Sequence, residues 1–446
     1  PVDCGVGEVC QGGACQSACD MVLAAPSSTG CSFLANRMDN YDNTGGDTVL
    51  VVSASKTQTA MVQLYLTPNN TDVEQAQGPA VAVAPGMIAE LKLPNPAIAK
   101  VSLLRKGGSY RVQSDIPIVA YQHSSTANKG SAEASLLLPE HTLRLAHVVA
   151  SYTHDLGDSP SYFDVVATAD NTIVQWTPPV STSAGMGVAA VMAGATGQVV
   201  LNRADTLQVR VPSLSDISGT LVSGDKPIWV TGAANCVNVP QNVTFCDHLQ
   251  EQMLPLDYWG KKYVGAHSPK RGNEKHYWRI YGGQDGTTVT AEPALPGTPV
   301  VVNKGEWKEI VAPNNVSTIF TSAKPFLAVQ YLEGHNGGAQ TGDPSMYQMV
   351  PVEQFLASYA FATGIGYTSN YAQIIRLKGN PDVLVDGVAV VGYATVGAYE
   401  VADYKVAQGA HFAESAAPFG LIVAGYAANS SYAAPGGLKL AVINPQ

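Results

Sequence analysis

The chain has 446 residues, more than one hydrophobic core usually organises, so we expect roughly two to four domains. Its formal net charge of −10, without any basic run, excludes nucleic acid and anionic membrane as partners, because both need clustered Lys or Arg. No apolar stretch is long enough for a membrane span. Only 13% of the residues are charged. A surface so poor in charge suits contact with copies of the chain or a partner, and equally suits a low-charge extracellular coat.

Five of the seven cysteines fall within the first 31 residues, at Cys4, Cys10, Cys15, Cys19 and Cys31. This clustering predicts a disulfide-rich segment, residues 1–30, in a protein that is secreted or displayed on the cell surface. A zinc knuckle is the alternative, but the spacing lacks C-x-x-C pairs and no histidine is nearby. The chain begins with proline rather than methionine, so we expect that a leader was removed or omitted.

An acidic loop follows, in which Asp39, Asp42 and Asp47 are interspersed with asparagine and glycine. Such clusters of oxygen donors suit calcium, which extracellular modules bind weakly, so these three aspartates are a candidate structural calcium site. The loop lacks the D-x-D-x-D-G register and a late bidentate glutamate. A plain Asx-turn loop without metal is the favoured interpretation. No other cofactor is expected.

Two sets of prolines recur along the chain at separations of 93 to 116 residues. One set closes short apolar runs and the other opens buried strands. They are Pro26, Pro139, Pro255 and Pro351, and Pro117, Pro227, Pro325 and Pro418. The two sets alternate in one order, which indicates four repeats. Repeats of this length match an immunoglobulin-like β-sandwich of about 100 residues better than a propeller blade of roughly half that length.

We therefore predict an all-β protein of four tandem immunoglobulin-like β-sandwich repeats after the disulfide-rich segment. The repeats are expected at residues 31–136, 137–252, 253–348 and 349–446. The alternative architecture interlocks neighbouring repeats in pairs, or forms a propeller from paired half-units.

Within the repeats, period-two apolar runs flank short turns, as in SYFDVVATADNTIVQW, HYWRIYGGQDGTTVTAEP and NYAQIIRLKGNPDVLVDG. The turn residues tolerate positive φ, so each such stretch is interpreted as a hairpin. Helix is expected to be scarce, with a single turn at junction segments such as PVEQFLAS.

The junction between the second and third repeats is the least random part of the chain. Cys236 and Cys246 are predicted to form a disulfide that closes a short polar loop and contributes about 2 to 3 kcal/mol. Asp247, His248 and Glu251 follow it and could form a metal or recognition site. The favoured interpretation is that these polar groups cap the disulfide loop and hold an irregular backbone.

The same junction carries a family signature: CDHL, then EQ, Pro255, Trp259-Gly260 and Tyr263. With the following YWRI and DGTTV block, it resembles the IgGFc-binding protein N-terminal domain family over roughly residues 100 to 350. The resemblance implies extracellular adhesion or a matrix role without enzymatic activity. No Fc-binding residue is carried over, and Trp259 is interpreted as a packed plug between domains.

Enzyme motifs are missing from the sequence: there is no H-E-x-x-H, nucleophile elbow, P-loop or dinucleotide fingerprint. The leading hypothesis is a non-enzymatic extracellular structural or adhesive protein that self-assembles head-to-tail into a surface filament or matrix. The second is a monomeric surface module that binds a glycoconjugate or a host protein. An extracellular hydrolase is the third.

Overall fold

The computed structural model describes residues 5, 7–11, 14–42, 44–94, 100–127, 130–153, 157 and 159–446. The all-β prediction is confirmed, because strands dominate and α1 (Ala18–Ala24) is the one α-helix in the described part of the chain. Ahead of α1, β1 (Glu8–Gln11) and β2 (Ala14–Ser17) form an antiparallel hairpin. Cys19 is bonded to Cys31, and Cys15 is also in a disulfide, whereas Cys4 lies outside the described residues.

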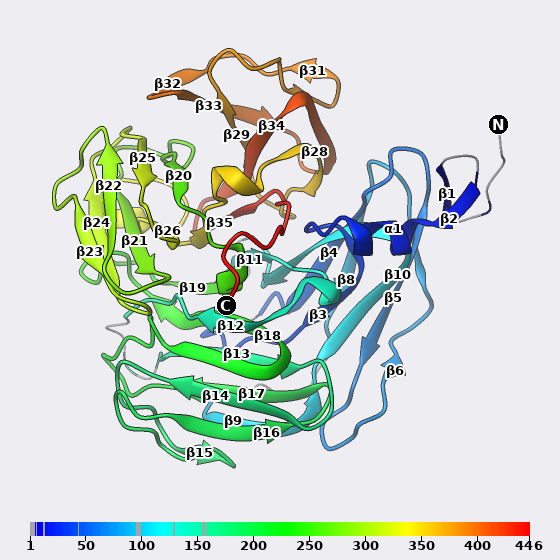
Figure 1. Cartoon of the computed structure of the whole chain (residues 1–446), viewed down its shortest axis with the longest axis vertical. Helices are drawn as coiled ribbons and strands as arrows, with labels where there is room; N and C mark the ends of the chain where they lie inside the picture. Colours follow the sequence, from blue (N-terminus) through cyan, green and yellow to red (C-terminus); the bar gives the residue numbers. More distant parts are fainter. Residues whose placement is uncertain are drawn as a thin grey trace.

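The other strands fall into four units around a common centre (Figure 1). The first unit contains β3 (Gly30–Ala35), β4 (Asp47–Ser53), β5 (Ala60–Leu66), β6 (Gln75–Ala76), β7 (Val81–Val83), β8 (Ile88–Lys92), β10 (Tyr110–Ser124) and β11 (Glu133–Leu136). The second contains β9 (Ser102–Gly108), β12 (Arg144–Val148), β13 (Ser161–Ala167), β14 (Thr172–Thr177), β15 (Gly185–Met186), β16 (Gly197–Leu201), β17 (Asp205–Arg210), β18 (Leu221–Val237) and β19 (Asp247–Gln252).

The third unit contains β20 (Lys262–Gly265), β21 (His276–Gly282), β22 (Thr287–Glu292), β23 (Val300–Val302), β24 (Trp307–Ala312), β25 (Thr318–Thr321), β26 (Phe326–Leu332) and β27 (Met346–Gln348). The fourth contains β28 (Leu356–Ala362), β29 (Ser369–Leu377), β30 (Leu384–Val385), β31 (Val388–Ala389), β32 (Ala394–Val396), β33 (Tyr399–Val406), β34 (Ala410–Ala427) and β35 (Ser430–Pro435). Single 3-10 turns lie between or within units: η1 (Glu140–Thr142), η2 (Leu256–Tyr258), η3 (His335–Gly337) and η4 (Val352–Gln354). The turn expected in PVEQFLAS is therefore confirmed as η4.

All four units share one pattern of strand pairing, seen most simply in the third. There, one sheet has the order β20-β25-β22-β23 and the other β24-β21-β26-β27. The first two strands of the unit thus lie in different sheets, whereas an immunoglobulin domain places its first two strands in one sheet. The units are two-sheet structures, but their strand order departs from the expected immunoglobulin order.

The predicted hairpins are wrong in their pairing. Asn171 and Gly286 do adopt the positive φ that the turns require, at 54° and 63°. However, β13 pairs with β17 and β18, while β14 pairs with β16 and β18. Each turn therefore carries the chain from one sheet to the other, and in the second unit the two strands meet only through the long strand β18.

The second set of prolines marks where that long strand changes sheets. In the second unit, β18 pairs with β12 and β14 around residues 221–224 and with β13 and β19 from residue 228 onward, and Pro227 lies between these regions. Pro117 and Pro418 lie inside β10 and β34 in the same way, and Pro325 separates β25 from β26. Proline has no N–H to donate, so it is tolerated where the ladder is interrupted. Pro325 therefore opens a strand as predicted, whereas Pro117, Pro227 and Pro418 lie within strands.

The last strands of the four units, β11, β19, β27 and β35, form the centre. β11 packs against β19 and β35, and β27 packs against the same two strands, so the four enclose an axis. One cluster of buried hydrophobic residues includes residues of all four units, while a second lies within the first unit. The units are therefore arranged in a closed ring with a continuous hydrophobic core, and not as separately packed domains in a row.

Closure of the ring joins a segment near the start of the chain, at Ser28, to one near its end, at Leu438. Ser28 N–H donates to the Leu438 carbonyl at 2.9 Å, and Leu438 N–H donates to the Ser28 hydroxyl at 3.0 Å. The final segment, residues 436–446, then crosses the Gln354 side chain and reaches Asp257, whose carbonyl accepts from Asn444 N–H at 3.0 Å. The final segment is thus held by hydrogen bonds within its own chain.

One strand from the range of the first predicted repeat belongs to the second unit. β9 falls inside the predicted repeat 31–136, yet it pairs antiparallel with β17 and parallel with β15 of the second unit. Sheet membership therefore crosses the predicted boundary at this strand. No helix in the described part of the chain is long and apolar enough to cross a membrane.

Candidate functional site: the junction of the second and third units

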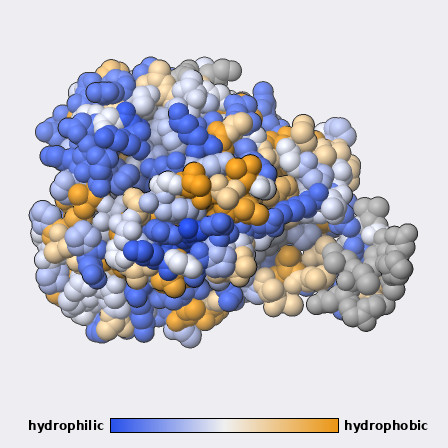
Figure 2. All heavy atoms as spheres, turned by 90° about the horizontal axis from the view of Figure 1, so that it is seen from above, coloured by the Kyte–Doolittle hydropathy of each residue, from blue (hydrophilic) through white to orange (hydrophobic). Residues whose placement is uncertain are grey.

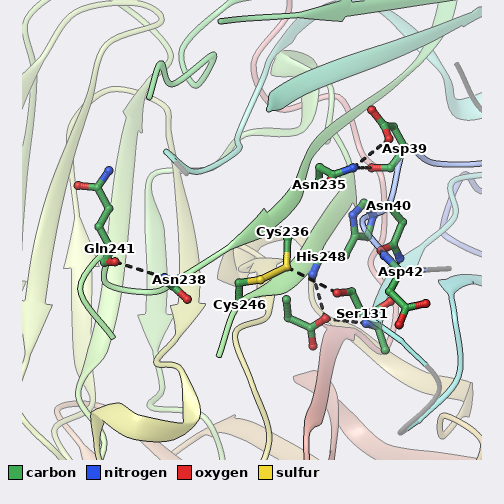
Figure 3. The surroundings of a disulfide bond; sticks show 12 residues. Asp39, Asn40, Asp42, Ser131, Asn235, Cys236, Asn238, Gln241, Cys246 and His248 are labelled. Atoms are coloured by element: carbon green, nitrogen blue, oxygen red, sulfur yellow. Dashed lines mark hydrogen bonds between the residues drawn. A yellow bond between two sulfur atoms is a disulfide. The ribbon is translucent and has the colours of Figure 1, made fainter. Parts of the chain in front are cut away.

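The loop between β18 and β19 is closed by a disulfide between Cys236 and Cys246, whose Cα atoms lie 5.3 Å apart (Figure 3). Inside this loop, Asn238 Nδ2 donates to the Gln241 carbonyl at 3.4 Å. The loop is also tied to the third unit, because Gly334 N–H donates to the Val239 carbonyl at 2.8 Å. The disulfide loop, residues 236–246, is therefore held at both its base and its side.

The polar junction residues Asp247, His248 and Glu251 lie on β19, in the centre of the ring, and all three are buried. Asp247 Oδ1 accepts hydrogen bonds from the N–H groups of Ala132 at 2.7 Å and His248 at 2.9 Å. Glu251 Oε1 accepts from the Gln348 side chain at 3.4 Å, which joins β19 to β27. Asp247 and Glu251 thus bond to residues of other units, and none of the three side chains faces solvent.

Burial dominates the electrostatics of these groups. It raises the pKa of Glu251 to about 8 and lowers the pKa of the His248 imidazole to about 4. Burial also raises the pKa of Asp247 and Glu133 well above their usual range, and their proximity to other carboxyl groups adds to the effect. Burial thus favours a neutral imidazole and protonated carboxyl groups at the centre of the ring.

Pro255, Trp259 and Gly260 continue the signature into η2 and the third unit. Pro255 precedes η2, and the buried Trp259 donates its indole N–H to the Leu254 carbonyl at 2.9 Å. Gly260 lies so close to Pro351 that an added Cβ would fall 2.3 Å from the Pro351 side chain. These residues pack the third unit against Pro351, which lies at the junction with the fourth unit. The family signature therefore forms a contact between units of the ring rather than part of an exposed surface.

The candidate calcium ligands do not come together. Asp39 pairs with Arg210 at 3.5 Å and Asp47 pairs with Arg37 at 3.0 Å. Asp42 instead accepts the backbone N–H of Thr44 at 3.1 Å, which is an Asx-turn bond. No cluster of three His, Cys, Asp or Glu placed to hold a metal ion occurs among the residues that the structure describes. Arginine side chains therefore balance two of the three carboxylates.

A groove that the sequence did not reveal opens beside the disulfide loop. It has a volume of about 540 Å³ and lies between the second and third units. Its lining residues are Tyr152, Thr153, Pro240, Gln241, Asn242, Arg279, Trp307 and Glu309. A pocket of this size between structural units is a usual location for ligand binding.

The floor of this groove is a stack of two aromatic rings around Arg279. The guanidinium carbon lies 4.1 Å from the centre of the Tyr152 ring and 3.9 Å from that of Trp307. Arg279 also pairs with Asp216 at 2.8 Å and with Glu309 at 3.2 Å. Burial opposes ionisation of Asp216, but Arg279 and neighbouring donors hold the pKa of Asp216 below its usual value.

Two residues of this groove lie in segments that are recognisable in the sequence. Arg279 belongs to the YWRI block of the family resemblance, and Trp307 begins the short strand EWKEIVAP. What could not be inferred is that Tyr152 lies beside them, because it comes from a loop more than a hundred positions earlier in the chain. Neither residue type nor spacing connects these three positions.

Comparison with known proteins supports the junction signature. Among solved structures, a chain described as "Biofilm associated protein - BSP domain" is 8% identical, with a TM-score of 0.15, and the alignment covers 92% of this chain and 96% of that one. A structural similarity with so low a TM-score supports no conclusion about the fold or the function of this protein. No curated protein matches the chain. The family described as "IgGFc binding protein" matches residues 133–425, from the start of β11 nearly to the end of β34. Since this is more than half of the chain, the protein belongs to the IgGFc binding protein family.

Proposed function

We propose that this protein is an extracellular binding or adhesive module that holds a glycoconjugate or an extracellular protein in the groove beside the disulfide loop. The observation that carries the proposal is the groove itself, with its aromatic and polar lining at the junction of two units. The family name supports binding of an extracellular protein. Disulfides such as Cys19–Cys31 and Cys236–Cys246 support an oxidising, extracellular location.

We further propose that the module performs no catalysis. The tempting polar trio Asp247, His248 and Glu251 is buried at the ring centre, out of reach of a substrate. In the groove, Arg279 is already engaged by Asp216 and Glu309, so its charge is committed to the fold. Binding by shape and hydrogen bonding is the role that such a lining supports best.

Adhesion assays with the purified protein test this function. The protein is incubated with immobilised immunoglobulin G, its Fc fragment and a panel of glycoproteins, each with and without enzymatic removal of its glycans. We expect saturable binding to at least one surface, weakened by substitutions in the groove. Uniform failure to bind, or binding that no groove substitution alters, contradicts the proposal.

Self-assembly into a filament or matrix is the second candidate function. Its support is the low fraction of charged residues, 13%, together with exposed apolar side chains such as Val391 and Met192. Hydrophobic residues gather in separate patches between hydrophilic ones on the face in Figure 2. Because residues 436–446 are bound within their own chain, a head-to-tail contact would have to use other surfaces. Light scattering and negative-stain microscopy of concentrated protein test it, and a uniform monomer contradicts it.

A further inference from the structure

We infer that the groove between the second and third units is a binding site for neutral saccharides, an inference that rests on the proposed binding function and names its ligand class. The groove is lined by the Trp307 ring, which is partly exposed, and by amide, hydroxyl and carboxylate groups, whereas the Tyr152 ring is buried behind them. Aromatic rings offer a flat apolar surface to the C–H face of a sugar ring, and polar side chains at the rim match its hydroxyl groups.

The floor is rigid before any ligand arrives. The Trp307 indole N–H donates to the Ser218 carbonyl at 3.2 Å, which fixes the ring orientation. Arg279 lies between the Tyr152 and Trp307 rings and donates to the Ser151 carbonyl at 2.9 Å and the Ser218 hydroxyl at 3.1 Å. A preorganised surface loses little conformational entropy on binding, which favours weakly interacting ligands such as sugars.

The charge of the groove selects against anions. Its one cation, Arg279, is paired with two carboxylates, Asp216 and Glu309, so the local charge is not positive. Glu309 is exposed at the rim, where its carboxylate repels a sialic or uronic acid but accepts hydrogen bonds from sugar hydroxyls. Neutral saccharides therefore fit the groove better than acidic ones.

The rim nearest the disulfide supplies neutral hydrogen-bonding groups. Gln241 and Asn242 are exposed and line the groove from the disulfide loop. The loop is braced beyond its disulfide, because Val243 N–H donates to the Pro240 carbonyl at 2.9 Å and Asn336 Nδ2 donates to the Thr244 hydroxyl at 2.6 Å. An amide side chain offers both donors and acceptors, as the hydroxyl groups of a neutral sugar require.

Titration calorimetry with defined oligosaccharides tests the inference. The probes are cellohexaose, chitohexaose and mannohexaose as neutral ligands, and sialyllactose and a heparin hexasaccharide as acidic ones. We expect at least one neutral probe to bind, with affinity lowered about tenfold or more by Trp307→Ala and by the pair Gln241→Ala and Asn242→Ala. Phe245→Ala is the matched control, because Phe245 is an exposed aromatic residue of the same loop outside the groove lining.

Each result of these measurements either supports or contradicts the saccharide inference. Trp307→Ala removes a packed ring, so its melting temperature is measured, and the surface pair at Gln241 and Asn242 gives the answer if that variant unfolds. No binding of any neutral probe, a preference for acidic probes, or equal loss in Phe245→Ala overturns the inference. If the protein still binds a deglycosylated extracellular protein through the groove, the proposed function stands and the saccharide inference fails. If no surface is bound in the adhesion assay and no probe binds, both fail.

Discussion

Glu133 accepts a hydrogen bond from the Ser345 hydroxyl at 2.8 Å, although 212 positions separate the two residues. The same carboxyl group accepts the Met346 N–H at 2.7 Å. Glu133 begins β11 of the first unit and Met346 begins β27 of the third, so these bonds cross the ring between units that are not neighbours. Buried carboxyl groups therefore connect the central strands to one another.

The burial of these groups makes stability depend on pH. Glu251 has a pKa of about 8 in the folded protein, raised by burial from 4.5. Its contribution is fully present below about pH 4.5 and is lost as pH rises through 8, because the folded state holds a proton that the unfolded state releases. We expect Glu251→Gln to flatten the pH dependence of the free energy of unfolding by up to about 1.4 kcal/mol per pH unit between about pH 5 and 8.

Urea denaturation at several pH values measures this effect. Gln keeps an acceptor oxygen for Gln348, so the variant is expected to fold. Glu90→Gln, at an exposed position of β8, is the control and should leave the slope unchanged. A slope that is the same in wild type and Glu251→Gln would show that the group ionises normally in the folded protein.

Removal of the disulfide of the junction loop should affect both stability and binding. The double substitution Cys236→Ser and Cys246→Ser is expected to lower the free energy of unfolding by about 2 to 3 kcal/mol, because the unfolded chain gains conformational freedom. It should also weaken groove binding, since Gln241 and Asn242 lose their fixed position. Thermal melting and the adhesion assay measure the two effects.

The second disulfide provides a matched control for that experiment. Cys19 and Cys31 enclose a span of 12 positions, against 10 for Cys236 and Cys246. Cys19→Ser with Cys31→Ser should therefore cost similar stability while leaving groove binding intact. Equal loss of binding in both double variants would mean that global destabilisation, not the loop, is responsible.

Arg279 is expected to be the most sensitive position of the groove. Arg279→Met would leave the Asp216 carboxylate without its partner and should lower the free energy of unfolding by about 3 to 5 kcal/mol. Lys56→Met is the control, because Lys56 also lies over an aromatic ring, Phe412 at 5.7 Å, but its side chain and that of its partner Glu414 are about half exposed. A loss of about 1 kcal/mol or less is expected there, and chemical denaturation compares the two.

The final segment of the chain is expected to stabilise the ring through Gln354. The Gln354 side chain donates to the Ala441 carbonyl at 2.7 Å and accepts the Ala441 N–H at 3.0 Å. Gln354→Ala should cost about 2 to 3 kcal/mol, because buried backbone groups lose their partners. It should also speed proteolytic cleavage within residues 436–446. Glu353→Ala, next to it and bonded to the exposed Lys261 N–H, should change neither quantity appreciably.

The sequence predicted those features that depend on neighbouring residues. Alternating apolar runs and turn residues placed several of the strands, such as β13, β21 and β29, and the spacing of the two sets of prolines predicted four units. Pairing between strands was predicted less well, because a turn such as Asp170-Asn171 looks alike whether it joins strands of one sheet or of two. The departure at β9 has the same origin, since its partner β17 lies about a hundred positions away.

The centre of the ring was the hardest part to predict. The almost wholly polar segment Asp247–Gln252 favours an irregular backbone that caps the disulfide loop, yet it forms strand β19, and every one of its residues is buried. The bonds that satisfy it come from distant units, such as those of Ala132 and Gln348. A buried polar strand can be recognised only when its partners are known, and those partners leave no local trace in the sequence.

The hydrogen bonds between Ser28 and Leu438 also determine when the ring can close during synthesis of the chain. They join residues 410 positions apart, so the first unit is made long before the partner that completes it. Contacts between residues this far apart in sequence form slowly, because the chain must lose the conformational entropy of a long loop before the contacts stabilise the fold. Until then β11 presents an uncovered side where β35 will pack. A nascent chain in this condition is open to wrong pairing with another copy, so a chaperone that shields the early units should raise the yield of closed rings.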